Sequence, residues 1–130
     1  DWVDAVFEKA AQTGAAMLAC PVNATLKRVE KGVIRETVDR ENLYEAQTPQ
    51  VFDAKLLRDA YVKIGKISGK ITDDAQLVEA LGHTVHIVET DYSNLKITRK
   101  SDLPIAEAII KSRPKPKPDG PIGPYVEAQW

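Results

Sequence analysis

The stretch AAMLACPV, residues 15–22, is apolar throughout apart from the proline at position 21 near its end. A continuous apolar run of this length favours a strand covered on both faces, as the strands of a parallel sheet are. Before it, apolar residues recur at helical spacing, and Gly14 then marks a stop. These residues are Val3, Val6, Phe7, Ala10 and Ala11. A helix followed by a buried strand indicates an α/β fold.

The segment after this strand, from about residue 23 to 45, is too polar for a core. Two short β-prone runs, Leu26–Val29 and Val33–Val38, flank the turn signal Glu30–Gly32. We expect a β-hairpin arm that projects into solvent or meets another surface.

The rest of the chain up to Lys111 contains further predicted helices and strands. In order, we expect a helix capped by Asp53 and ended by Gly65, a helix capped by Thr72 and ended by Gly82, strands over 84–89 and 95–98, and a last helix capped by Ser101. Beyond it, five of the eight prolines lie between Pro114 and Pro124. Residues 112–130 are therefore predicted to form a flexible, polyproline-like tail.

Composition indicates an ordinary globular chain of 130 residues, with 43% apolar and 28% charged residues. The net charge of −1 gives no reason to expect nucleic acid or a membrane surface as a partner. No apolar run reaches the ~18 residues of a membrane span. The single cysteine, Cys20, excludes an internal disulfide and is expected to be buried and inert. The start at Asp1, inside a helical pattern, favours a fragment or a processed chain.

Oxyanion-binding side chains gather in TVDRENLYEAQTPQVF, residues 37–52, which holds Arg40 and Thr48. Together with Thr72 and Lys96 they predict a phosphate-binding surface. Each residue also has a structural interpretation. Arg40 can form a surface ion pair, Thr48 can satisfy the backbone, Thr72 can cap a helix, and Lys96 can be solvated on an edge strand.

No glycine-rich nucleotide loop or hydrolase motif occurs in the sequence. Asp73 and Asp74 fall in the first turn of a predicted helix, where the helix dipole favours carboxylates. His83 and His86 lack a third ligand at metal spacing and are interpreted as structural. We therefore predict no metal ligands in this chain.

Four segments together resemble one family. PVNATLKRV, TVDRENLYEAQTPQVF, ITDDA and NLKITRKSDLPIAEAII, within residues 1–111, are similar to the C-terminal half of the methylerythritol phosphate cytidylyltransferases. The resemblance implies a partial Rossmann-like nucleotidyltransferase fold of the nucleotide-diphospho-sugar transferase type. It implies transfer of a cytidylyl group from CTP to methylerythritol phosphate, with Mg²⁺ and release of pyrophosphate, in non-mevalonate isoprenoid synthesis.

The resemblance also assigns residues. It implies that Lys96 is catalytic and that Thr25, Arg40, Thr48 and Thr72 bind methylerythritol phosphate. It further implies a homodimer in which the hairpin arm clasps a second subunit and carries Thr25 and Arg40 to its active site. The CTP site and the Mg²⁺ ligands would lie mainly outside this chain, so the chain alone is expected to be inactive.

Two alternatives remain open at this point. One is a cytidylyltransferase for another polyol phosphate, such as ribitol phosphate. The other is a non-catalytic interaction module whose working parts are the hairpin and the proline-rich tail. For the enzyme, the resemblance implies a location in the bacterial cytoplasm or in a plastid.

Overall fold

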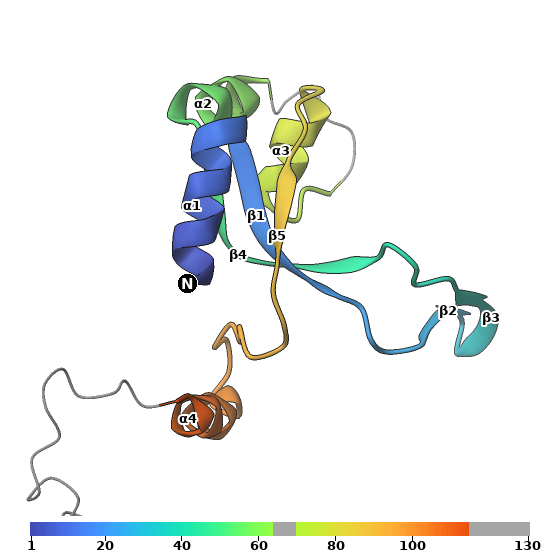
Figure 1. The fold of residues 1–130 in the computed structure, drawn as a ribbon. Coiled ribbons are helices and arrows are strands. Elements are labelled where there is room, and N and C mark those ends of the chain that lie inside the picture. Colours follow the sequence, from blue (N-terminus) through green and yellow to red (C-terminus); the bar gives the residue numbers. More distant parts are fainter. Residues whose placement is uncertain (64–69, 115–130) are drawn as a thin grey trace, which may run out of the picture. The chain divides into compact units, whose positions relative to one another are not determined.

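The helices and strands are taken from a computed structural model, which describes residues 1–63 and 70–114. The chain divides into two units, residues 1–96 and 97–130, and each is described by itself. The first unit contains α1 (Trp2–Thr13), β1 (Ala15–Pro21), β2 (Leu26–Glu30), β3 (Val33–Val38), β4 (Tyr44–Phe52), α2 (Ala54–Val62), α3 (Asp74–Ala80) and β5 (His86–Glu89) (Figure 1). The second contains α4 (Asp102–Ser112).

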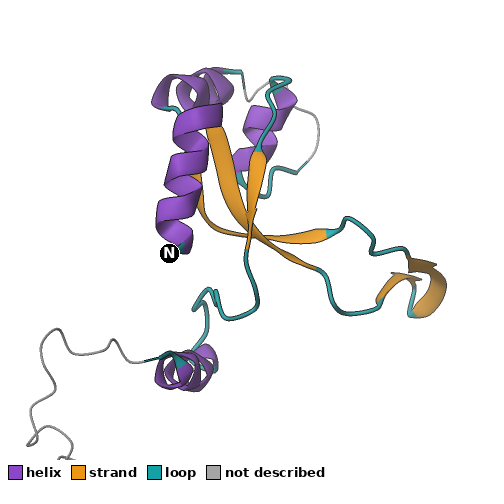
Figure 2. Cartoon of the chain, viewed as in Figure 1, coloured by secondary structure: helices purple, strands orange, loops and turns teal. Residues whose placement is uncertain are grey.

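A three-stranded sheet in the order β4–β1–β5 is the centre of the first unit (Figure 2). The apolar run of β1 forms the middle strand, as predicted. The sheet is mixed, however, because β1 pairs in parallel with β5 and antiparallel with β4. Strand β5 follows two helices, which allow a parallel return, whereas β4 comes back directly from the hairpin. Strand β4 itself was not predicted.

Successive residues of β1 point to opposite faces of the sheet, and helices cover both faces. Ala16 and Leu18 pack on one face with Val6 and Ala10 of α1. On the other face Ala15 packs with residues of α2 and α3, namely Ala60, Leu77 and Val78. Six consecutive residues of β1 are buried for this reason. The predicted α/β architecture is confirmed in this part of the chain.

Cys20 lies within this buried strand and is fully covered. Burial raises the pKa of its thiol, and the negative charges of Glu45 and Asp91 raise it further. Since the thiolate is the nucleophilic form, a raised pKa makes this thiol unreactive. The expectation of a buried, inert cysteine agrees with this environment.

Helix α1 ends where the sequence predicts, whereas Asp1, expected inside the helical pattern, is its N-cap. Asp1 and Asp4 form a reciprocal capping box at its start. Gly14 ends it with a φ of 84°, a left-handed conformation that glycine adopts without steric cost. Val3 and Phe7, which share the helical pattern, are 47% and 56% exposed. The buried face of α1 is therefore narrower than the apolar pattern of the sequence suggests.

The helix caps of α2 and α3 correct two expectations. Asp53 caps α2 as predicted, by accepting hydrogen bonds from the N–H groups of Lys55 and Leu56. The helix ends at Val62, before the predicted stop at Gly65, which lies outside the described residues. At α3 the cap is Asp73, whose carboxylate accepts from the Gln76 N–H at 3.0 Å.

Thr72 is therefore not the N-cap of α3. Its N–H and hydroxyl instead contact the side-chain oxygen of Gln76, at 2.9 and 3.3 Å. The side chain of Gln76 thus extends back over the start of α3 to bind Thr72. The backbone N–H of Gln76 donates to the Asp73 carboxylate.

This difference between neighbours gives a stability prediction. Asp73→Ala removes the cap and should lower the free energy of unfolding by about 1–2 kcal/mol. Thr72→Ala should cost clearly less, because it leaves the cap in place. Urea unfolding followed by circular dichroism measures both variants. Equal losses, or a larger loss for Thr72→Ala, would contradict the assignment of the cap.

The prediction of a strand over 95–98 is wrong, because this segment pairs with no strand in the described part of the chain. The strand expected over 84–89 is also shorter and covers only His86–Glu89. The alternation of Leu95, Lys96, Ile97 and Thr98 resembles a strand, but the chain turns at 92–93 and does not return to a sheet edge.

In the second unit, α4 begins near the predicted Ser101, but the Ser101 side chain makes no capping hydrogen bond. The carboxylate of Asp102 instead binds the backbone before the helix, accepting from the N–H groups of Thr98 and Arg99, both at 2.9 Å. These hydrogen bonds lower the pKa of Asp102. Of the tail predicted over residues 112–130, Ser112 is the last residue of α4, and residues 115–130 lie outside the described residues.

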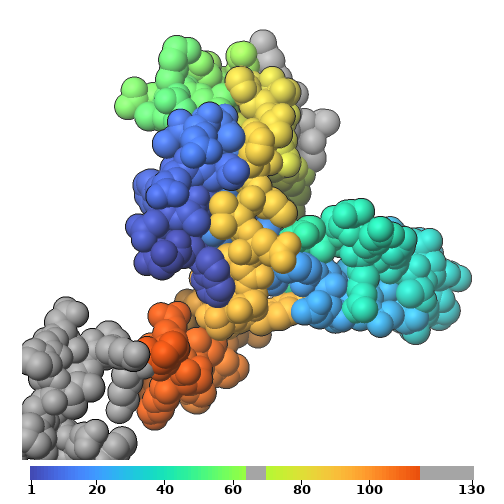
Figure 3. Space-filling model, viewed as in Figure 1, coloured from blue at the N-terminus to red at the C-terminus, as the bar shows by residue number. Residues whose placement is uncertain are grey.

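Strands β2 and β3 form a two-stranded antiparallel sheet of their own, joined by a turn with Lys31 and Gly32 at positive φ. Almost all of their residues are exposed, including Val29, Val33 and Ile34, each more than half exposed. Figure 3 shows the atoms of this hairpin at the molecular surface. A hairpin at the predicted position is therefore present, and its role as a clasp on a second subunit stays a prediction.

Among the described residues, the helices are all too short or too polar to traverse a lipid bilayer.

Candidate functional site

An irregularity in β4 shapes the candidate site. Met17 of β1 pairs with Gln50, and Ala19 pairs with Ala46, so β4 advances four residues while β1 advances two. The additional residues form a bulge around Gln47, Thr48 and Pro49, where the Thr48–Pro49 peptide bond is cis. Bulges lie preferentially on sheet edges and beside active sites, where they redirect side chains. Proline is tolerated here because β4 is an edge strand.

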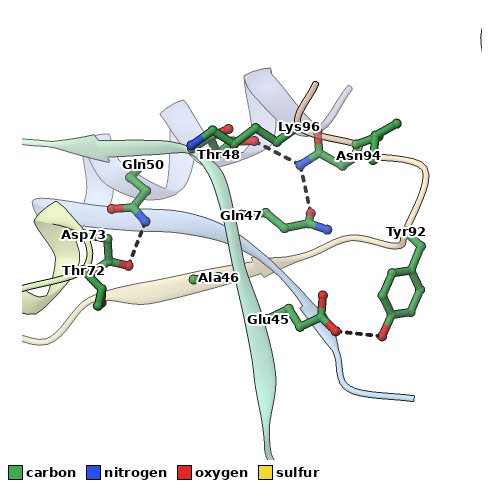
Figure 4. A pocket seen from close by; sticks show the side chains of 11 residues that line it. Glu45, Ala46, Gln47, Thr48, Gln50, Thr72, Asp73, Tyr92, Asn94 and Lys96 are labelled. Carbon is green, nitrogen blue, oxygen red and sulfur yellow. Dashed lines mark hydrogen bonds between the residues drawn. The ribbon is translucent and has the colours of Figure 1, made fainter. Parts of the chain in front are cut away.

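A pocket of about 470 Å³ lies against this bulge. That volume is within the range of small-molecule sites. Its lining comes from β4, from the start of α3 and from the loop after β5 (Figure 4). The lining residues are Glu45, Ala46, Gln47, Thr48, Gln50, Thr72, Asp73, Tyr92, Asn94, Leu95 and Lys96.

Three of the five predicted site residues meet in this pocket. Thr48 lies in the bulge, Thr72 directly precedes the N-cap of α3, and Lys96 lies in the loop after β5. Two hydroxyls and an ammonium are donors suited to phosphate oxygens. The structure thus brings together side chains that are 24 residues or more apart in sequence.

Lys96 is the cation among the residues that line the pocket, beside the carboxylates of Glu45 and Asp73. Lys96 is exposed, and no ion pair found in residues 1–63 and 70–114 includes it. The two carboxylates of the lining already have partners. Glu45 lies 3.2 Å from the Tyr92 hydroxyl, and Asp73 accepts from Gln50 and from the α3 backbone.

Gln50 ties the sheet to α3 and so fixes the wall that carries Thr72. Its side-chain nitrogen donates to Asp73 Oδ2 at 3.0 Å, and its oxygen accepts from the Ala75 N–H at 3.2 Å. Both ends of one amide are therefore used across the joint between β4 and α3, and Figure 4 shows the bond to Asp73. A buried or half-buried amide with all its partners holds its neighbours in one arrangement.

Tyr92 connects the loop after β5 with the root of the hairpin. Its hydroxyl accepts the Asn23 N–H at 3.2 Å and lies 3.3 Å from the carbonyl oxygen of Pro21. The same hydroxyl contacts Glu45, so one side chain touches both strands that lead into the hairpin. Beside it, the Tyr44 hydroxyl donates to Glu89 at 3.1 Å, and this bond raises the pKa of Tyr44.

Arg40 and Thr25 do not reach this pocket within one chain. The Arg40 guanidinium donates to the carbonyl oxygen of Asn23 and closes the root of the hairpin. The ion pair with Asp39 or Glu41, the structural interpretation of Arg40, is absent from the described residues. Thr25 is exposed on the connection from β1 to β2.

Sequence patterns did not point to five lining residues with polar roles, which are Gln47, Gln50, Asp73, Tyr92 and Asn94. Their partners lie 23 to 71 residues away along the chain, apart from the local cap made by Asp73. Only the dense run of amides and hydroxyls in EAQTPQ could have pointed to Gln47 and Gln50.

The described residues do not fit a metal centre. They contain no group of three or more His, Cys, Asp or Glu side chains placed to hold an ion. Glu45 and Asp73 are the acidic residues of the pocket, and both are engaged by protein donors. The described part of the chain therefore offers no ligand set for the Mg²⁺ that the resemblance implies.

The first unit is thus a helix-covered mixed α/β sheet with a phosphate-compatible pocket at its bulged edge. The crystal structure of 2-C-methyl-D-erythritol 4-phosphate cytidylyltransferase from Thermus thermophilus matches the chain with a TM-score of 0.73 and 40% sequence identity, over 84% of this chain and 54% of that one. The family model for 2-C-methyl-D-erythritol 4-phosphate cytidylyltransferase matches residues 1–112. The chain belongs to this family.

Individual relatives agree. The chain is 44% identical to the 2-C-methyl-D-erythritol 4-phosphate cytidylyltransferase of Bacillus licheniformis over 112 residues, which is 86% of this chain and 48% of the relative. It is 52% identical to that of Rhodopirellula baltica over 109 residues, 83% of this chain and 43% of the relative. The chain thus spans about half the length of the curated relatives it matches.

Proposed function

We propose that this chain supplies the acceptor-phosphate part of an active site that transfers a cytidylyl group from CTP to methylerythritol phosphate. The observation that supports it most directly is that Lys96, Thr48 and Thr72 line the same pocket. The relatives named above carry this activity in their names. The 130 residues contain no glycine-rich nucleotide loop, so the CTP site is proposed to lie on the part of the relatives that this chain does not match.

The proposed reaction needs no covalent enzyme intermediate. A phosphate oxygen of methylerythritol phosphate attacks the α-phosphorus of CTP and forms a new P–O bond. The bond from that phosphorus to the bridging oxygen of the β-phosphate breaks, and pyrophosphate leaves with its electron pair. The protein must position two polyanions whose mutual repulsion is ~1 kcal/mol per charge pair in water and several times larger in a drier cleft.

In this scheme Lys96 offsets that repulsion and stabilises the charge that develops at phosphorus. Thr48 and Thr72 donate to phosphate oxygens or to hydroxyls of the substrate. Arg40 and Thr25 grip the phosphate from the hairpin of a second subunit, so the proposed enzyme is a homodimer. The open position of both residues at the hairpin root, outside the pocket of their own chain, fits this arrangement.

The experiment that tests the function uses a chimera in which residues 1–112 replace the matching segment of the Bacillus licheniformis relative. We expect pyrophosphate release that requires both CTP and methylerythritol phosphate. A panel with ribitol phosphate and glycerol phosphate tests the acceptor. Turnover with ribitol phosphate but not with methylerythritol phosphate would reassign the acceptor substrate. A folded chimera without turnover, beside an active parent, would support a non-catalytic module.

Arg40→Ala in the chimera should mainly raise KM for methylerythritol phosphate. A charged hydrogen bond contributes ~1.5–3 kcal/mol, which corresponds to a roughly 10- to 100-fold change. KM for CTP should change little. Steady-state kinetics at saturating CTP measures the effect, and Arg28→Ala, in the same hairpin but paired with Glu36, is the matched control. An unchanged KM for methylerythritol phosphate would remove Arg40 from the site.

The dimer has its own test. Mixing an Arg40→Ala chimera with a Lys96→Ala chimera should restore part of the activity, because one of the two sites in a mixed dimer then carries both intact residues. No recovery after subunit exchange, verified by native mass spectrometry, would argue against sharing across subunits. Mg²⁺ and a location in the bacterial cytoplasm or a plastid also belong to the proposal, on the strength of the family resemblance.

A further inference from the structure

Three polar side chains form a connected network of which two, Gln47 and Asn94, line the pocket, while the third, Thr90, is buried behind them. The mechanism above uses none of them. They are Gln47 on the β4 bulge, Thr90 directly after β5, and Asn94 in the loop that follows. Thr90 is 7% exposed and is the one buried polar side chain in the part of the chain that the structure describes. Burying polar groups is costly unless they are paired, so their pairing shows what they hold in place.

The Gln47 amide is the junction of this network. Its oxygen lies 2.5 Å from the Thr90 hydroxyl and accepts from Asn94 Nδ2 at 2.8 Å. Its nitrogen donates to the carbonyl oxygen of Asp91 at 3.3 Å. Both lone pairs of the amide oxygen are therefore used, and both contacts run to the segment after β5.

Two further contacts join the network to the pocket and to the core. Asn94 Nδ2 also donates to the backbone oxygen of Thr48, at 3.0 Å (Figure 4). Thr90 lies against β1, with its hydroxyl 3.2 Å and its N–H 2.9 Å from the carbonyl oxygen of Ala19. The network therefore runs from the buried central strand to the residue that carries one of the proposed phosphate donors.

The segment that carries Lys96 needs such an attachment. It pairs with no strand among the described residues, so no sheet ladder fixes its backbone. Asn94 stands two residues before Lys96 and binds β4 at the bulge. One side-chain amide thus fixes the distance between the backbone of Thr48 and the backbone that presents the ammonium.

We propose that Gln47, Thr90 and Asn94 are positioning residues that hold Lys96 and Thr48 in register for phosphoryl chemistry. The proposal rests on the proposed function of Lys96. A flexible lysine can neutralise a phosphate from many positions, but charge stabilisation in a transition state depends on placement, and a shift of ~1 Å can cost roughly 100-fold in rate. Loss of the network should therefore lower kcat far more than it raises KM for CTP.

A double-mutant cycle in the chimera tests this. Asn94→Ala is expected to lower kcat/KM for methylerythritol phosphate by about tenfold, and Lys96→Ala by more. If Asn94 acts through Lys96, the double variant should be within about threefold of Lys96→Ala alone. Val6→Ala, a buried site on α1 far from the network in sequence, is the stability control: it should lower Tm without lowering kcat.

Different results overturn different statements. If Lys96→Ala has wild-type kinetics, the proposed function of Lys96 fails, and the positioning role fails with it. If Lys96→Ala lowers kcat/KM but Asn94→Ala does not, only the positioning role is wrong. The same holds if the loss of kcat/KM in the double variant equals the product of the losses in the two single variants. If Asn94→Ala does not fold, Thr90→Val replaces it in the same cycle, with Thr90→Ser as the conservative variant that should restore kcat.

Discussion

Lys96→Ala is expected to lower kcat of the chimera by roughly 100-fold or more, the scale seen when one preorganised charge-stabilising donor is removed from an active site. The ammonium lines the pocket with Thr48 and Thr72, and it forms no ion pair within the described residues. It is thus available to a phosphate. Steady-state pyrophosphate release measures the loss, and the far-UV circular dichroism spectrum should stay unchanged.

Two matched variants sharpen this prediction. Lys96→Arg keeps the charge but changes its shape and reach, so it should recover only part of kcat. Lys63→Ala removes an exposed lysine after α2 and should leave the kinetics unchanged. A Lys96→Ala enzyme with wild-type kcat and KM would remove the residue from the mechanism.

Leu77→Ala is expected to lower the free energy of unfolding by about 3 kcal/mol, within the range for a buried leucine truncated to alanine. Leu77 is 1% exposed and packs with Ala15, Ala60 and Val78 between α3, α2 and the sheet. Such a loss is a large share of the ~5–15 kcal/mol that keeps a typical domain folded. Urea unfolding of the 130-residue chain measures it.

Val62→Ala is the control for this prediction. Val62 is 84% exposed at the end of α2, so its truncation should change the unfolding free energy by no more than ~0.5 kcal/mol. If Leu77→Ala and Val62→Ala cost the same, the cluster around Leu77 does not form the core that the structure describes.

The core was predictable because its signal is local. The run from Ala15 to Cys20 is apolar without interruption, and only a strand with helices on both faces gives each of those side chains a place. Helix α1 is also predictable from local sequence, because Gly14 ends it. Apolar period and glycine position determine these elements, and neither depends on a distant partner.

Strand β4 and the segment around Lys96 could not be predicted for the opposite reason. EAQTPQ is polar and contains a proline, so it lacks the pattern of a strand, yet β1 supplies its backbone partners. Leu95–Thr98 has the pattern of a strand but finds no such partner among the described residues. Hydrogen-bonding neighbours, supplied by the fold, decide both cases.

The site shows the same division. Thr48, Thr72 and Lys96 were expected from a family resemblance, and the structure places them on one pocket. Gln47 and Asn94 were not expected, because an amide in a polar segment has no periodic signature. Their partnership spans 47 residues of sequence and exists only once β4 and the loop after β5 are side by side.

The bulge of β4 has a consequence for how this family can change. The apolar core takes only the end of β4, Val51 and Phe52, whereas one wall of the pocket depends on two surplus residues earlier in that edge strand. A short deletion there would straighten the strand and abolish the cavity while sparing the interior. Descendants of such a sequence could therefore lose the proposed phosphate-binding pocket and persist as stable scaffolds.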